Sequence, residues 1–253
     1  MAVTAGTYLG FPPPLLGDRP QRLFVYAIAE DWLCLEKPAG IAAEPAAAKQ
    51  GDPVLPAALN TQIEHGKPEM QRLGLRPCGN VYPLATELSG PVLLAMGKDA
   101  RTRLRNDYGS RAFTFVFEFW TSAPAPESAE LSCEAPILEV PGDPPRISRR
   151  FGKRARTDFR LLEQVGGWTR WEARSTFPRA RQVYLHAARS GLPVVSEADL
   201  PAGAGQGSGF PAGPWLRLCR FEGLDGLPED WPALDWDGLR RRLERGPRQK
   251  KRY

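Results

Sequence analysis

The sequence lacks several features that would point to particular classes of protein. No apolar run approaches the roughly 20 residues that cross a bilayer, and the N-terminus lacks the basic and apolar regions of a secretion signal. There is no Gly-x-Ser-x-Gly elbow and no glycine-rich phosphate loop. The 2 histidines and 4 cysteines are scattered, with no Cys-x-x-Cys pair. We therefore expect neither a membrane span nor a zinc site, and we expect a reduced, cytoplasmic setting.

The composition is typical of a soluble globular protein that buries a core, with 253 residues, 42% hydrophobic and 25% charged. The net charge of +5 is unevenly distributed. Basic residues crowd residues 146–156 and 240–252. Such clusters favour a polyphosphate partner, although a solvated face and a disordered basic tail fit them equally well.

Periodicity and turn residues predict more strands than helices. We expect a flexible arm over 1–21, one domain over 22–245 and a basic tail over 246–253, with an irregular loop at 201–214. Strict β-α-β alternation is absent, which favours an α+β fold with a mixed, mostly antiparallel sheet. The strands are expected at 23–28, 32–36, 92–96, 112–120, 157–164, 169–176 and 215–221, and the helices at 54–63, 99–108, 182–190 and 236–244.

One segment identifies a family. Tyr82-Pro-Leu-Ala-Thr-Glu-Leu-Ser-Gly90, followed by an apolar strand, resembles the active-site motif of the RluA-type pseudouridine synthases, His-Arg-Leu-Asp-x-x-Thr-Ser-Gly. Further fragments resemble the same family in the same order along the chain. They lie at 30–40 (with Lys37-Pro-Ala-Gly40), 111–120, 135–137, 153–162 and 179–197.

The resemblance implies a pseudouridine synthase fold, a curved mixed sheet with a few flanking helices and an RNA-binding cleft. The family isomerises uridine to pseudouridine in ribosomal or transfer RNA, and it uses no cofactor and no metal. The target base leaves the stack to reach the pocket. We therefore expect structured RNA, with ribosomal RNA as one candidate, as the partner of a monomeric protein.

The substitutions in this chain fall where the family's chemistry would occur. Ala85 occupies the position of the catalytic Asp, and a methyl group cannot act as a nucleophile or a base. Phe117 replaces the pocket Tyr, whereas Arg179, which would pair with the Asp, is retained. Turn and core positions such as Ser89-Gly90 and Pro136-Ile137 are also retained. This pattern predicts a folded, catalytically impaired RNA-binding protein.

Two alternatives remain open. Glu87 is a candidate replacement acid, because residues two apart in an extended segment face the same side; the fold could also serve as a protein-interaction scaffold. Arg179, without its carboxylate, is expected to meet an RNA phosphate or Glu87. His186 is expected to bond locally on its helix. Candidate RNA-binding residues are Arg149, Arg150, Lys153, Arg154, Arg181, Arg241, Lys250 and Lys251.

Overall fold

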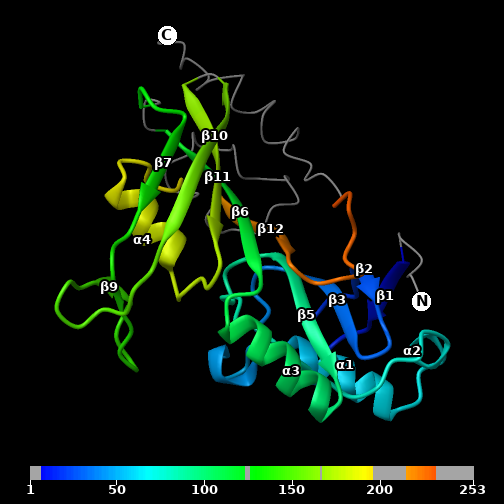
Figure 1. The fold of residues 1–253 in the computed structure, drawn as a ribbon. Coiled ribbons are helices and arrows are strands. Elements are labelled where there is room, and N and C mark those ends of the chain that lie inside the picture. The colour runs from blue at the N-terminus through cyan, green and yellow to red at the C-terminus, as the bar shows by residue number, and fades with distance from the viewer. Residues whose placement is uncertain (1–6, 123–125, 166, 196–214, 232–253) are drawn as a thin grey trace, which may run out of the picture. The chain divides into compact units, whose positions relative to one another are not determined.

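The computed structural model describes residues 7–122, 126–165, 167–195 and 215–231 (Figure 1). The chain forms two compact units, where the sequence predicted one domain. The first unit comprises Met1–Thr114 and Leu218–Trp231, and the second comprises Phe115–Arg217 and Pro232–Tyr253. The predicted loop at 201–214, the helix at 236–244 and the basic tail lie outside the described residues.

The first unit contains a five-stranded sheet with the order β1-β2-β3-β5-β4 and antiparallel ladders. Every residue of β5 is buried, which explains why that strand reads as an apolar run rather than an alternation. The strands are β1 (Thr7–Phe11), β2 (Gln21–Ile28), β3 (Trp32–Lys37), β4 (Cys78–Asn80) and β5 (Gly90–Met96).

Helices cover this sheet (Figure 1). α3 (Lys98–Gly109) contacts β5 and buries Ala100, Leu104 and Tyr108, which are four residues apart and form one stripe. α1 (Leu55–Glu64) contacts β4. Both helices confirm the sequence predictions, whereas α2 (Pro68–Arg72) and a 3-10 turn at Pro45–Ala47 were not expected.

The flexible arm expected at residues 1–21 is wrong for Thr7–Phe11. This segment is strand β1, in which Leu9 lies opposite Leu23 of β2. Leu9 and Phe11 are almost completely buried. Large apolar residues alternate with other residues over this segment, as in a strand. The prolines that directly follow it led to the prediction of a flexible arm instead.

The second large sheet has the order β12-β6-β11-β10-β7, and β8 and β9 form a separate two-stranded pair. These strands belong to the second unit, except that β12 from Leu218 onward and Thr114 of β6 belong to the first. The strands predicted at 157–164 and 169–176 pair as a hairpin, in which Val165 lies opposite Trp168 and Gly167 adopts φ 85°, as a two-residue hairpin turn requires. The elements are β6 (Thr114–Thr121), β7 (Glu130–Cys133), β8 (Ile137–Leu138), β9 (Arg146–Ile147), β10 (Thr157–Val165), β11 (Trp168–Ser175), α4 (Gln182–Arg189) and β12 (Leu216–Glu222).

The predicted α+β class is confirmed, with antiparallel ladders in both large sheets. The core contains Trp32, Trp120 and Trp171, whereas Trp168, also on a strand, is only half-buried. Among the described helices, none combines the length and the apolar composition that crossing a bilayer demands. Strands β7, β8 and β9 were missed because they are short and follow no clear alternation.

Candidate functional site

The segment that resembles the family motif forms a tight turn in the first unit. The backbone N–H of Leu88 donates to the carbonyl of Ala85 over 3.0 Å, so Thr86 and Glu87 are the central residues of the turn. The extended geometry on which the case for Glu87 depended is therefore wrong. Ala85 is half-buried, while Glu87 is exposed.

A buried amine holds this turn in place. Lys37, at the end of β3, is 0% exposed, and its Nζ donates to the carbonyls of Ile41 at 2.7 Å and Leu88 at 2.6 Å. The carbonyls of Pro38 and Thr86 lie at 3.0 and 3.3 Å. Burial lowers the pKa of Lys37 to about 8, so the amine still carries its proton at pH 7.

Backbone contacts fix both ends of the motif. The N–H of Gly40 donates to the carbonyl of Thr86 over 2.8 Å, and the N–H of Leu218 donates to that of Ser89 over 3.1 Å. Gly90 adopts φ 143°, and a Cβ there would lie 2.3 Å from the carbonyl oxygen of Leu218. Retention of Lys37-Pro-Ala-Gly40 and Ser89-Gly90 thus has a physical reason, because these residues shape the turn independently of Ala85.

Tyr82, at the family's His position, is a core residue. Its ring is buried and meets that of Phe221 edge-on with centroids 5.5 Å apart, and its hydroxyl donates to the carbonyl of Pro91 over 2.6 Å. Burial raises the pKa of this phenol well above its usual value. Tyr82 is therefore neutral at physiological pH, and it stabilises the segment by packing in the core.

The predicted catalytic residues lie in both units. Ala85 and Glu87 belong to the first, and Phe117 and Arg179 to the second. Phe117 is buried in β6 opposite Ala173 of β11. Among the described residues, Glu87 makes no hydrogen bond and no ion pair. Its role as a replacement acid stays a prediction.

Arg179 has a carboxylate partner, contrary to expectation. Its Nη1 lies 3.5 Å from Oε2 of Glu139, and its Nε donates to the carbonyl of Arg154 over 3.2 Å. Oε1 of Glu139 also accepts from the backbone N–H of Ala180 over 3.0 Å. No local pattern in the sequence points to Glu139, because only the fold brings together these two residues, which are 40 positions apart.

Two retained residues of the 179–197 fragment form buried hydrogen bonds between α4 and the sheet. The side-chain amide of Gln182 donates to Oγ of Ser175 at 2.9 Å and Oγ1 of Thr157 at 3.0 Å. His186 contacts Thr157 through Nδ1 at 2.9 Å and the carbonyl of Ala135 through Nε2 at 2.8 Å. The expected local bonding of His186 is wrong, because its partners belong to other elements.

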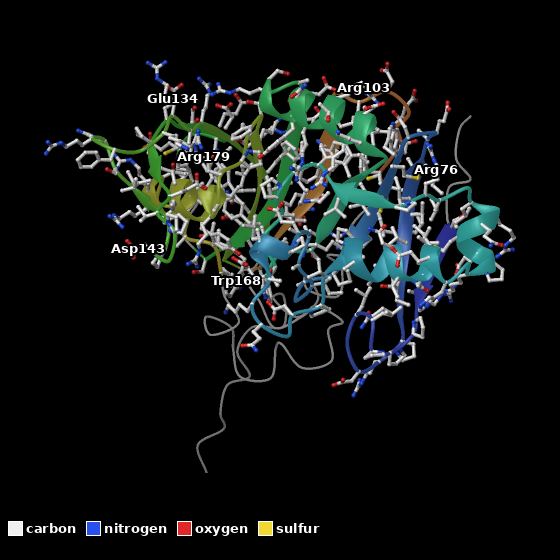
Figure 2. The ribbon with its side chains drawn as sticks, turned by 90° about the horizontal axis from the view of Figure 1, so that it is seen from below. Arg76, Arg103, Glu134, Asp143, Trp168 and Arg179 are labelled. Carbon is white, nitrogen blue, oxygen red and sulfur yellow. The ribbon has the colours of Figure 1, made fainter. Side chains whose placement is uncertain are left out.

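The predicted basic cluster lies in the second unit. Some of its cations are paired: Arg146 lies 3.6 Å from Asp143, and Arg156 lies 2.6 Å from Glu134. The two carboxylates are labelled in Figure 2. The remaining basic side chains are exposed and make no ion pair with any described residue; they are Arg149, Arg150, Lys153 and Arg154.

Arg181, also predicted to bind RNA, precedes α4 in a left-handed conformation (φ 55°), and its guanidinium lies 5.7 Å from the centre of the Tyr184 ring. The candidates Arg241, Lys250 and Lys251 lie outside the described residues. Within the described parts of the chain, no three His, Cys, Asp or Glu side chains gather as metal ligands would.

Comparisons with known proteins agree with the resemblance. No model of a protein family matches the sequence. The chain is 28% identical over 163 residues to an uncharacterised RNA pseudouridine synthase of Chloroflexus aurantiacus. The matched region covers 64% of this chain and 49% of the relative, so the chain spans about half the length of that protein.

Two solved structures share the fold. Human RNA pseudouridylate synthase domain containing 4 matches with a TM-score of 0.62 and 16% identity, over 87% of this chain and 92% of that chain. Human RNA pseudouridylate synthase domain containing 1 matches with a TM-score of 0.57 and 16% identity, over 89% and 96%. The predicted pseudouridine synthase fold is confirmed.

Proposed function

Since this chain has the pseudouridine synthase fold, we propose that it binds structured RNA without isomerising uridine. The observation that carries the proposal is Ala85, a methyl side chain at the position of the family's catalytic Asp. A methyl group offers neither a nucleophile nor a proton acceptor, so the reaction would have no group to start it.

The surroundings of Ala85 support a loss of catalytic activity in a segment that keeps its backbone conformation. Lys37 and Gly40 hold the carbonyls of Thr86 and Leu88 from outside the turn. Glu87 is the nearest acid along the chain, but it is an exposed central residue of the turn. A catalytic carboxylate needs placement within about 0.5 Å, which an exposed side chain without a hydrogen bond or ion pair to a described residue does not provide.

Unpaired cations support RNA binding. Arg149, Arg150, Lys153 and Arg154 carry positive charge that no described carboxylate offsets. Neutralising phosphates with such side chains releases condensed counterions, which drives association at low salt. We propose a structured RNA, ribosomal RNA among the candidates, bound in the cytoplasm by a monomer.

The test combines binding with catalysis. Tritium release from RNA labelled at uridine C5 would be measured for the unaltered chain, Ala85→Asp and the uncharged control Ala85→Asn, on RNA that each variant binds. We expect no release from the unaltered chain or from Ala85→Asn. Release by the unaltered chain would overturn the loss of catalysis, and absence of salt-sensitive RNA binding would overturn the RNA-binding role. Release by Ala85→Asp alone would identify the carboxylate as the missing group.

A further inference from the structure

An exposed aromatic ring stands among the unpaired arginines of the second unit. Phe151 is 64% exposed, the highest value among the exposed large hydrophobic residues described. The guanidinium of Arg150 lies over its ring, 4.9 Å from the centroid. An exposed ring adds little hydrophobic stabilisation to the fold, and an aromatic ring set among cations is the combination on which a nucleic-acid base can stack.

The turn that carries Phe151 is rigidly built. The backbone N–H of Gly152 donates to the carbonyl of Ser148 over 2.9 Å, and the hydroxyl of Ser148 accepts from the N–H of Phe151 at 3.3 Å. Lys153 and the buried Ile137 exchange two backbone hydrogen bonds, of 2.8 and 2.9 Å. A Cβ at Gly152 would lie 2.4 Å from the Ser148 carbonyl oxygen, so the turn closes only around glycine.

A cavity of about 310 Å³ lies at the base of this turn, within the second unit. Its wall includes Arg149 and Arg189 together with Ser132 and Ser190. The one carboxylate in the wall, Glu134, is paired with Arg156 at 2.6 Å. Neither Arg149 nor Arg189 makes an ion pair with a described residue. The cavity therefore carries uncompensated positive charge. The Ser190 hydroxyl can donate to an anion there, whereas that of Ser132 donates to the carboxylate of Asp158 over 2.8 Å.

We propose that this turn and cavity form a binding subsite for an unpaired nucleotide of RNA. The base stacks on the ring of Phe151, and a phosphate of the same strand lies between Arg149 and Arg189. Base stacking on an aromatic side chain is available only to nucleotides outside a duplex. The inference rests on the proposed RNA binding and adds to it which part of an RNA this surface selects. Charge favours RNA over a protein partner, because every nucleotide of RNA brings a phosphate, whereas a protein would need carboxylates placed to match the two guanidinium groups.

The test compares two RNAs with equal numbers of phosphates, a hairpin with an unpaired loop and a fully paired duplex, each bound to the full-length chain. Phe151→Leu keeps an apolar side chain but removes the flat ring. We expect it to weaken hairpin binding about 5- to 150-fold, from a stacking contribution of about 1–3 kcal/mol per base, and to leave duplex binding unchanged. Phe151→Trp keeps a flat aromatic ring at this position and should bind the hairpin as tightly as the unaltered chain does. Val140→Ala, which shortens another exposed apolar side chain between β8 and β9, is the matched control and changes neither affinity.

The arginines are tested by salt dependence. The double variant Arg149→Gln and Arg189→Gln should weaken the binding of hairpin and duplex alike and reduce the slope of log affinity against log salt by about two. If the unaltered chain binds the hairpin and Phe151→Leu binds it equally well, or loses hairpin and duplex equally, the stacking subsite is overturned while RNA binding stands. If the unaltered chain binds neither RNA, the proposed function itself fails.

Discussion

The Nζ of Lys37 lies 2.6 Å from the carbonyl oxygen of Leu88, 51 residues further along the chain. This contact joins the end of β3 to the turn that holds Ala85. It places a charged amine in the core of the first unit, where carbonyl oxygens replace its water. The shape of the turn therefore depends on a residue that the motif itself does not contain.

Lys37→Met should destabilise the protein by about 2–4 kcal/mol, because it leaves several buried carbonyls without a donor. Lys98→Met makes the same substitution at an exposed position and should change the free energy of unfolding by less than about 0.5 kcal/mol. Chemical denaturation of both variants provides the comparison. Equal stabilities would show that the amine does not hold the turn.

Gly90→Ala should destabilise by about 2 kcal/mol or more, since an added Cβ at φ 143° would collide with the carbonyl of Leu218. Gly109→Ala is the control, because a Cβ at that glycine meets nothing within 4 Å. The control should be neutral or stabilise by up to about 1 kcal/mol. Thermal unfolding distinguishes the two; a neutral Gly90→Ala would contradict the close approach of the two strands.

Gln182→Met preserves much of the side-chain volume but removes the amide that bonds Thr157 and Ser175. We expect a loss of about 2–3 kcal/mol, because the buried hydroxyls and the carbonyl of Arg156 lose their donor. Gln164→Met, on the exposed part of β10, should cost less than about 0.5 kcal/mol. A similar cost in both variants would mean that Gln182 is not a bridge between α4 and the sheet.

His186 should make the protein less stable in mild acid. Burial, with a further contribution from nearby Arg189, lowers its pKa below the usual value of 6.5. The unfolded chain then takes up a proton at a higher pH than the folded chain does, so the free energy of unfolding falls as pH drops below about 6.5. The sequence holds 2 histidines, so an NMR titration with His65→Gln as the assignment variant isolates His186. A His186 pKa at or above 6.5 would contradict this.

The sequence predicted the elements whose pattern is local. The strands β10 and β11 and the helix α3 were predicted from the residues of their own segments. What it missed arises from contacts between distant segments. Glu139 meets Arg179 across 40 positions, and His186 meets Ala135 across 51. Only the folded backbone brings such pairs within reach, so neither residue carries a local sign of its partner.

For the candidate site, too, the sequence indicated some residues, while others became apparent only in the structure. Resemblance to a motif located Ala85, Phe117 and Arg179 and indicated the fold. It assigned Lys37 to a retained turn without showing that its amine is buried, since burial of a lysine depends on which carbonyls surround it. The sequence did not indicate a role for Phe151, because a Phe is normally expected in the core. Its exposure is seen only in the structure.

The anchoring of the Ala85 turn from outside has a practical use. Three of the 4 cysteines, Cys34, Cys78 and Cys133, are buried, and Cys219 is partly so. A cysteine introduced as Ala85→Cys would be half-exposed in a backbone that Lys37 and Gly40 keep in position. Position 85 therefore offers an attachment point for a spectroscopic label or a cross-linker, on a chain in which burial shields three of the four native thiols.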